Sequence, residues 1–248
     1  MSEELRVLPV DGLPEVSEGT RVGELIAARS SLQEADVVVI SQKIVSKAEG
    51  MVRRLSEVTP SARARELASE LDKDPALVEL VLGESTEVLR AERGVLIAET
   101  HHGFVCANAG IDSSNLPEDG TACLLPKDPD ASARAIRAEL ESAGPAIAVV
   151  IADSFGRAWR LGQAEVAIGC AGLTPLDDWR GRRDAGGREL NATLIAVADE
   201  AAAAADLVRT KDAAVPVAVV RGLSRYVTPE DGPGAAALRR APAEDLFR

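Results

Sequence analysis

Runs of apolar residues bounded by polar or glycine-rich segments predict the strands of this chain. The expected strands are Leu5–Val10, Val37–Ile40, Ser85–Leu89, Val95–Ala98, Ala146–Ala152 and Val215–Val220. Val37–Ile40 is β-branched throughout and Ala146–Ala152 carries no charge, which is typical of buried strands. The residues Glu92-Arg93-Gly94 predict a turn that pairs the strands Ser85–Leu89 and Val95–Ala98.

Helical spacing of apolar residues predicts helices at Arg21–Arg29, Ser61–Leu71, Asp74–Leu82, Asp130–Ser142 and Glu189–Leu207. Asp74 is placed to cap its helix, with Pro75 at the first helical position. The segment Gln163–Leu173 is small, apolar and interrupted by glycine, with Glu165 as its one charge, and this composition permits close backbone packing. The charged, glycine-bearing stretch Asp177–Arg188 is predicted to be a mobile loop.

The composition excludes several classes of protein. A net charge of -12 at pH 7 opposes binding to nucleic acid, which requires a basic surface. No apolar run approaches the roughly 18 residues of a membrane span, and the charged start MSEELR lacks the apolar region of a signal peptide. We therefore expect a cytoplasmic protein that binds neither nucleic acid nor membrane. The odd number and wide spacing of Cys106, Cys123 and Cys170 favour free, buried thiols.

Hard-oxygen side chains follow two predicted strands and suggest a metal site. Asp112 and Asn115 lie in a glycine-rich loop after Val95–Ala98, and Asp153 and Ser154 directly follow Ala146–Ala152. Carboxylate and hydroxyl oxygens suit Mg²⁺ or Mn²⁺ better than Zn²⁺ or copper. Each aspartate taken alone is more typical of a carboxylate that caps a turn or a helix. The metal hypothesis therefore requires the fold to bring the two aspartates together.

Two further segments could bind phosphate. The turn Asp11-Gly12-Leu13-Pro14 leaves backbone amides unpaired, although a simple surface turn would have the same sequence. Lys43 and Lys47 follow the strand Val37–Ile40 and could contact phosphate or be solvated. The chain contains neither GxxxxGK[ST] nor GxGxxG, so a bound nucleotide would need a different kind of site.

Six motifs, in this order, carry a family resemblance across nearly the whole chain: PVDGLPEV, SQKIVSKAEG, ETHHGFVCANAGIDSSN, ADSFGRAWRLGQAEVAIGCAGL, RGRRDAGGREL and KDAAVPVAVVRG. Together they resemble the coenzyme F(420):L-glutamate ligase family. The resemblance implies one module over residues 1–248 with an α+β fold of two subdomains, built from mixed sheet and helices, that intertwines with a second copy. In such a homodimer, the alanine-rich Glu189–Leu207 and the apolar Ala164–Leu173 are candidates for burial between subunits.

The same resemblance implies an activity and its substrates. Members of the family are GTP-dependent amide ligases that add L-glutamate to coenzyme F(420)-0, giving F(420)-1 and further γ-glutamyl forms. The expected route is phosphorylation of the substrate carboxylate by GTP, followed by attack of the glutamate amine on the acyl phosphate. A divalent metal, Mg²⁺ or Mn²⁺, is expected as cofactor, and K⁺ is a further candidate ion.

The matching motifs also imply site residues. The expected metal ligands are Asp112, Asp153 and Ser154. The expected nucleotide-site residues are Gly12, Leu13, Pro14, Glu15, Ser41, Gln42, Lys47, Asn115, Lys211 and Asp212. Charge alone suggests that Arg157 and Arg160 pair with the substrate phosphodiester or with the carboxylates of glutamate, because a planar guanidinium suits both groups.

Two alternative functions would also use a metal and a nucleotide but would not include ligation. One is a nucleotide-binding regulatory module, and the other is a metal-dependent phosphohydrolase in which Asp112 and Asp153 activate water. Neither explains the arginine-rich segment Arg157–Arg188 together with the ordered motifs.

Overall fold

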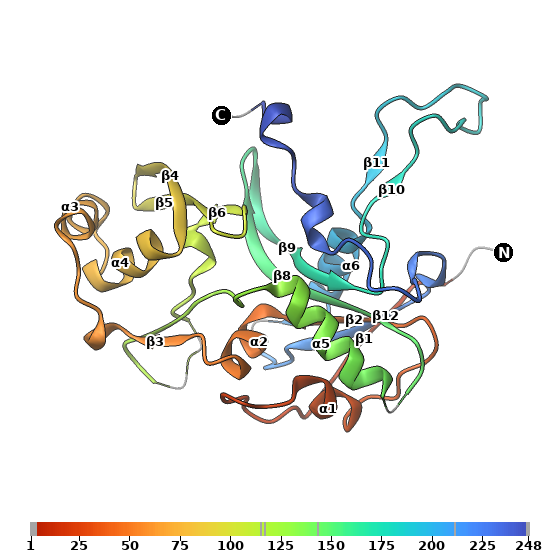
Figure 1. Ribbon diagram of the computed structural model, residues 1–248, viewed down its shortest axis with the longest axis horizontal. Helices are drawn as coiled ribbons and strands as arrows, with labels where there is room; N and C mark the ends of the chain where they lie inside the picture. Colours follow the sequence, from red (N-terminus) through yellow and green to blue (C-terminus); the bar gives the residue numbers. More distant parts are fainter. Residues whose placement is uncertain (1–3, 115, 117, 143, 211, 247–248) are drawn as a thin grey trace.

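The apolar runs and helical patterns assemble into two lobes that lie side by side (Figure 1). The computed structural model describes residues 4–114, 116, 118–142, 144–210 and 212–246. The larger lobe contains a five-stranded sheet, and the smaller lobe contains a three-stranded sheet with two helices. This combination is compatible with the expected α+β class. Within the described ranges, we find no helix that is both long enough and apolar enough to span a membrane.

The predicted apolar strands form the centre of the five-stranded sheet. Its order is β1 (Arg6–Pro9), β12 (Val217–Arg221), β2 (Val37–Ser41), β8 (Ala148–Arg157) and β9 (Arg160–Ala171). The strands β2 and β8 are parallel, and the other neighbouring pairs are antiparallel. Successive residues of the central strands alternate between two hydrophobic clusters, so both faces of this sheet are buried. That double burial explains why these strands are continuous apolar runs in the sequence.

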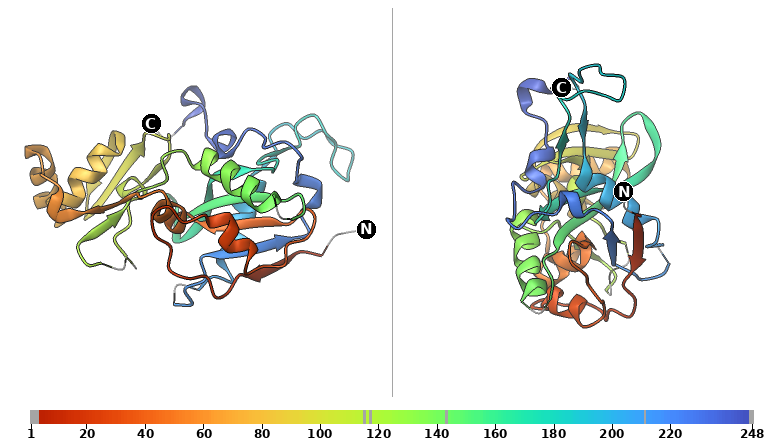
Figure 2. Two further views of the ribbon diagram at one scale, coloured as in Figure 1. Left: turned by 60° about the horizontal axis from the view of Figure 1, so that its bottom comes forward. Right: turned by 90° about the vertical axis from the view of Figure 1, so that its right-hand side faces the viewer.

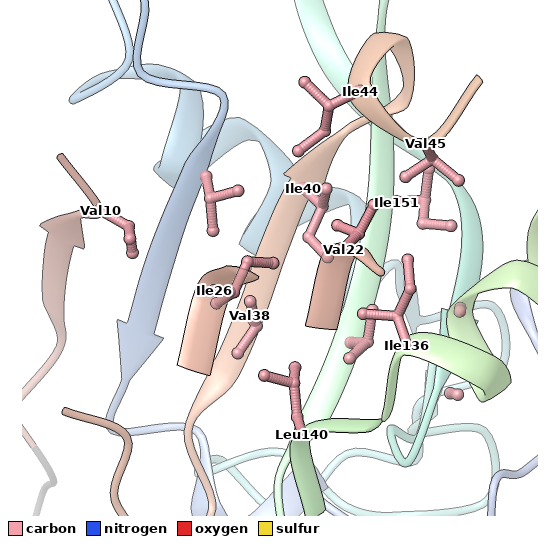
Figure 3. Packing of buried hydrophobic residues seen from close by; sticks show 14 of the residues in the cluster. Val10, Val22, Ile26, Val38, Ile40, Ile44, Val45, Ile136, Leu140 and Ile151 are labelled. Carbon is pink, nitrogen blue, oxygen red and sulfur yellow. The ribbon is translucent and has the colours of Figure 1, made fainter. Parts of the chain in front are cut away.

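Helices cover both faces of the sheet. On one face, α1 (Val22–Ala27), α2 (Gln42–Ala48) and α5 (Pro129–Glu141) contribute side chains such as Ile26 and Ile136, which pack against the strands (Figure 3). On the other face lies α6 (Val197–Asp206), whose alanines contact the sheet. Burying a side chain of the size of isoleucine stabilises the fold by roughly 1.5–3 kcal/mol.

The smaller lobe contains the two predicted helices and the predicted strand pair, together with a third strand that the sequence analysis did not predict. Its elements are α3 (Ala62–Leu71), α4 (Pro75–Gly83), β4 (Ser85–Glu92), β5 (Val95–Thr100) and β6 (Val105–Ala107). The Asp74 carboxylate accepts hydrogen bonds from two amides of the first turn of α4, which confirms the predicted cap. Arg93 and Gly94 have positive φ angles of 54° and 74° at the turn between β4 and β5, as a tight hairpin requires. The antiparallel pair β3 (Val52–Arg54) and β7 (Thr121–Cys123) lies where the chain leaves and re-enters the larger lobe.

Two elements extend beyond their predicted limits or fall short of them. Strand β8 continues past Ala152 to Arg157, because its outer half pairs with β9 in a hairpin whose polar side chains give no apolar pattern. The helix predicted at Glu189–Leu207 is wrong in its first half, since α6 begins at Val197. Instead, β11 (Leu194–Ile195) pairs with β10 (Asp177–Asp178) at the base of an exposed excursion that extends away from the lobe (Figure 2).

The glycine-interrupted segment is the inner part of β9 and packs closely, as predicted. A Cβ atom on Gly169 would lie 2.3 Å from the carbonyl oxygen of Pro129, so the strand can approach α5 only with glycine at this position. Ile168 and Leu173 are buried within the chain itself, as are the inward alanines of α6. These side chains are thus covered within one chain, whereas Leu194 and Leu207 of the other expected segment are 46% and 83% exposed, and burial of these segments between subunits stays a prediction.

All three cysteines are buried and free, as expected. Burial raises the pKa of both Cys106 and Cys170 to about 12, and neighbouring carboxylates, Asp153 beside Cys106 and Asp130 beside Cys170, act in the same direction. These thiols therefore stay protonated in the folded chain at pH values at which they ionise in the unfolded chain.

This difference predicts a loss of stability at alkaline pH. An unfolded thiol ionises above about pH 8.5, so the free energy of unfolding should fall between that pH and about 12 by about 1.4 kcal/mol per pH unit for each such thiol. Thermal unfolding measured from pH 7 to pH 11 would show the decline. The double variant Cys106→Ala/Cys170→Ala should flatten it, and an equally steep decline in that variant would assign the effect to other groups.

Candidate functional site

Two cavities meet at the end of β2, where the chain enters α2. The register of the parallel strands places Ser41 beside Ala152 of β8, so the residues that follow both strands lie together. One cavity has a volume of about 490 Å³ and the other about 350 Å³. Ser41, Lys43 and Glu165 line both. The carboxyl ends of parallel strands are a common place for ligands to bind, and the cavities extend from such an edge.

The larger cavity, called here the lysine cavity, has Lys43 and Lys47 on its wall. Its lining also includes most of the residues that the resemblance assigns to the nucleotide, namely Leu13, Pro14, Glu15, Ser41, Lys47 and Asp212. Lys47 Nζ lies 2.5 Å from a carboxylate oxygen of Glu15. Lys47 is nearly buried, with its ammonium group paired to Glu15 at the cavity wall.

The other expected nucleotide residues are placed differently. Gly12 has a positive φ angle of 73° in the turn after β1, but it is not part of the described wall of either cavity. Gln42 lines the smaller cavity, and its side-chain oxygen accepts a hydrogen bond from Ser46. Asn115 and Lys211 lie outside the described residues, so the structure gives no position for them.

The smaller cavity, called here the aspartate cavity, is lined by all three expected metal ligands. Asp153 and Ser154 come from β8, and Asp112 comes from the loop between the lobes, where it forms a bridge with Cys123 of β7. The two carboxylates are far apart in the sequence, and the fold brings them to one cavity. The metal hypothesis requires Asp112 and Asp153 to lie together, and the fold places both on the wall of this cavity.

Lys43 holds Asp112 at the boundary of the two cavities. Its Nζ lies 2.8 Å from Asp112 Oδ2 and donates to the carbonyl oxygen of Ser114 at 2.8 Å. Burial alone would raise the pKa of Asp112, but the hydrogen bonds from Lys43 and from the Ser114 amide outweigh it and lower the pKa below its usual value. Asp112 is thus a carboxylate, with a lysine ammonium beside it.

Glu165 and Arg209 are site residues that the sequence analysis did not identify. Glu165 Oε1 accepts a hydrogen bond from the Ser154 hydroxyl at 2.8 Å, and Glu165 Oε2 accepts one from Arg209 Nη2 at 3.0 Å. Glu165 could have been identified as a site residue because it is the one charge in an otherwise apolar segment. No local pattern indicated Arg209, which follows α6 and lines the lysine cavity.

Arg157 and Arg160 lie at the exposed end of the β8–β9 hairpin and do not reach the described walls of either cavity. The Arg157 guanidinium donates to the carbonyl oxygen of Leu161 at 2.7 Å, so it is used in part to close the hairpin. Trp159 and Leu161, between and after the two arginines, are 82% and 98% exposed. Exposed apolar side chains at a hairpin end are characteristic of a contact surface.

The donor groups of the aspartate cavity fit a divalent cation of the magnesium type. In the described part of the chain, no three His, Cys, Asp or Glu side chains form a group that could hold a metal by themselves. A cation that binds through one or two carboxylates and completes its shell with water and phosphate oxygens needs no such group, and this is how Mg²⁺ usually binds. Asp112, Asp153 and Ser154 offer only oxygen atoms, which suit Mg²⁺ or Mn²⁺ better than a thiophilic metal.

Comparison with known proteins identifies the family. The sequence profile of the F(420)-0:gamma-glutamyl ligase family matches residues 12–222. The chain is 45% identical to the coenzyme F(420):L-glutamate ligase of Methanothermobacter thermautotrophicus over 251 aligned positions, which cover 98% of this chain and 99% of that protein. It is 43% identical to the protein of the same name from Methanopyrus kandleri, with 98% of each chain covered. The corresponding protein of Haloarcula marismortui is 43% identical, with 98% of this chain and 96% of that protein covered. The chain therefore belongs to the F(420)-0:gamma-glutamyl ligase family.

Proposed function

We propose that this protein is a GTP-dependent ligase that joins L-glutamate to coenzyme F(420)-0 and then to the growing γ-glutamyl tail. The names of its relatives supply the two substrates, F(420) and L-glutamate. The observation that carries the proposal is the pair of cavities with common walls, because ligation by an acyl phosphate requires a nucleotide and an acceptor carboxylate in adjacent sites.

The lysine cavity is the proposed nucleotide site. Lys43 and Lys47 each pair with a carboxylate, Asp112 and Glu15, and they place two ammonium groups on the wall of this cavity, where a triphosphate could contact them. Lys43 lies on the common wall, so a terminal phosphate in its reach would point into the aspartate cavity. Ser41 lies on the same wall and adds a hydroxyl.

The proposed reaction has two steps. A carboxylate oxygen of F(420)-0 attacks the γ-phosphorus of GTP, the bond to the β-phosphate oxygen breaks, and GDP leaves. The amine of glutamate, having lost a proton, then attacks the acyl carbon, forming the amide and releasing phosphate. Lys43 orients the phosphate that is transferred and keeps Asp112 in place.

A divalent cation is part of this proposal, with Mg²⁺ and Mn²⁺ both suited to the oxygen donors. Asp112, Asp153 and Ser154 would hold it. When bound, it would neutralise part of the phosphate charge that opposes attack by a carboxylate. The chain's own contribution is to place two carboxyl side chains, Asp112 and Asp153, on the wall of one cavity, where they would attract the cation.

We also propose that the protein works as a homodimer. Arg157 and Arg160 lie away from the cavities of their own chain, and the exposed Trp159 and Leu161 beside them form an apolar contact surface. Insertion of this hairpin into a second copy would bury the apolar pair and bring the arginines to a substrate that carries a phosphodiester and carboxylates.

Replacing Leu161 with glutamate should weaken that dimer about thirtyfold, because it places a charge at the centre of the contact. Light scattering over a range of protein concentrations would measure the dissociation constant. Leu246→Glu is a matched control, since Leu246 is 84% exposed and lies in the C-terminal tail. A Leu161→Glu protein that stays dimeric at the same concentrations as the control would contradict this interface.

The activity is tested by mass spectrometry of F(420)-0 after incubation with the purified protein, L-glutamate, GTP, K⁺ and either Mg²⁺ or Mn²⁺. Mass increments of glutamyl residues that require GTP, and not ATP alone, are the expected result. GTP binding with an unchanged F(420)-0 mass would favour a regulatory binding module. Phosphate release that does not depend on glutamate would favour a phosphohydrolase.

A further inference from the structure

Ser154 and Glu165 form a cross-strand pair at the wall of the aspartate cavity. They are directly opposite each other in the register of β8 and β9, so their side chains lie on the same face of the sheet. The Ser154 hydroxyl donates to Glu165 Oε1 at 2.8 Å. Glu165 is nearly buried, and its other oxygen is 3.0 Å from Arg209 Nη2, which is equally buried. Both oxygens of Glu165 therefore act as hydrogen-bond acceptors, one from the Ser154 hydroxyl and the other from the guanidinium.

Arg209 extends the network to the lysine cavity. Its Nη1 donates to the carbonyl oxygen of Pro216 at 3.1 Å. The same carbonyl accepts the backbone amide of Ser41 at 2.8 Å, and Ser41 lies on the wall common to the two cavities. Two buried side chains, Arg209 and Glu165, thus connect the end of β2 with Ser154 on β8.

The stability of the fold alone does not explain why the buried Arg209 occupies this position. Arg209 Nε is buried and has no hydrogen-bond partner among the described residues, which is unfavourable for the folded state. A buried ion pair generally contributes little more than apolar residues of the same size. By contrast, the Arg221–Asp36 pair, with Nε 2.7 Å from the carboxylate, involves no residue of either cavity wall.

The network fixes the polarity of Ser154. A serine hydroxyl has one proton and two lone pairs, and the proton is directed to Glu165. In its other directions the oxygen can then only accept hydrogen bonds or coordinate a cation. Such an oxygen suits a divalent cation and is unfavourable beside a bare phosphate oxygen.

We propose that Glu165 and Arg209 are a positioning pair, which orients the Ser154 oxygen as a cation ligand and ties its position to the nucleotide-binding end of β2. This inference rests on the proposed function, since it assumes that a metal and a nucleotide occupy the two cavities. Both residues line the lysine cavity, and their proposed effect on the cation acts through Ser154 and Ser41.

Glu165→Gln is the most direct test, because it keeps the shape of the side chain and reverses the polarity of the network. Arg209 has only donors, so the amide oxygen of Gln would turn to Arg209 and its NH₂ group to Ser154. Ser154 would then accept that hydrogen bond, and its own proton would be available to point into the cavity. We expect the affinity for Mn²⁺, measured by electron paramagnetic resonance of the full-length protein with saturating GDP, to fall about tenfold to a hundredfold.

A double-mutant cycle separates positioning from a purely structural role. In a Ser154→Ala background, Glu165→Gln should have almost no further effect on Mn²⁺ affinity, because the oxygen that it orients is absent. Asp36→Asn, in the Arg221 ion pair, is the matched control and should lower the melting temperature without changing Mn²⁺ affinity. If Glu165→Gln does not fold, Glu165→Leu/Arg209→Met removes both buried charges and should show the same loss and the same non-additivity.

The outcomes distinguish the two proposals. An unchanged Mn²⁺ affinity in a folded Glu165 variant, or an equal loss in the Ser154→Ala background, would overturn the positioning role and leave the proposed ligase intact. A wild-type protein that binds GDP but no Mn²⁺ would overturn the metal site of the proposed function, and the positioning role with it.

Discussion

Asp153→Asn is expected to reduce ligase turnover by about a hundredfold to a thousandfold, the loss typical of removing one group that stabilises charge in a transition state. Asparagine has the same shape but no charge, so the aspartate cavity keeps its form and loses half of its carboxylate pair. The reduction should appear in kcat, measured by mass spectrometry of the glutamylated product at saturating GTP. Raising the Mn²⁺ concentration should recover part of it, because a weakened site fills at higher metal concentration.

A matched aspartate tests whether the effect is specific to the cavity. Asp72 ends α3 in the smaller lobe with a positive φ angle of 52°, a conformation that asparagine adopts readily. Asp72→Asn should therefore keep full turnover and an unchanged melting temperature. Near-normal turnover in a folded Asp153→Asn protein would contradict the proposed metal site. Loss of turnover with a lowered melting temperature would instead indicate damage to β8.

The sequence predicts the central strands well because each of them is buried on both faces. Val37–Ile40 and the start of β8 have no solvent-facing side, so every position is apolar and the run is unmistakable. Local chemistry is equally informative at Asp74 and Pro75, whose capping and φ preferences act within one helical turn. Features of this kind depend on residues that are neighbours in the chain.

Features that depend on distant residues could not be predicted in this way. The outer half of β8 exists because β9 pairs with it, and its polar residues give no period-two apolar pattern. The residues Leu194–Ile195 form a strand because Asp177–Asp178 lies beside them, although alanine-rich sequence follows at once. Propensity favours helix at that point, and tertiary pairing overrides it.

In the candidate site, too, residue types could be predicted from the sequence, whereas contacts between distant residues could not. Asp112 and Asp153 could be named from their residue types and from the family resemblance, but their common cavity depends on the order of strands in the sheet and on the connection between lobes. The contact of Glu165 with Arg209 joins β9 to the segment after α6, and nothing in either local sequence indicates the other. The arginines at the hairpin end were assigned by charge alone, and their distance from the cavities of one chain is what leads to the dimer proposal.

Among substitutions of side chains outside the site, Arg137→Met is expected to lower the free energy of unfolding the most. Arg137 projects from α5 and is almost fully buried, and Nε donates to the carbonyl oxygen of Ile147 at 2.9 Å. Its other nitrogens bind Asp231 and the carbonyl oxygens of Thr228 and Pro229 at 2.9 to 3.1 Å. One guanidinium therefore holds the segment after β12 against the start of β8.

Methionine matches the length of arginine but supplies no donor, so the buried carbonyl oxygen of Ile147 and the partly exposed acceptors after β12 would lose their partner. Removing one partner of a buried charged network costs about 3–5 kcal/mol, which corresponds to a melting temperature about 6–20 °C lower for a chain of this size. Arg63→Met is the matched control, because Arg63 forms an exposed pair with Glu66 and should change stability by less than about 1 kcal/mol. Arg137→Lys should fall between them, since it keeps the charge and loses the fork of donors. If Arg137→Met unfolds within about 2 °C of the Arg63→Met control, water must satisfy these carbonyl groups, and the segment after β12 is held by its apolar contacts instead.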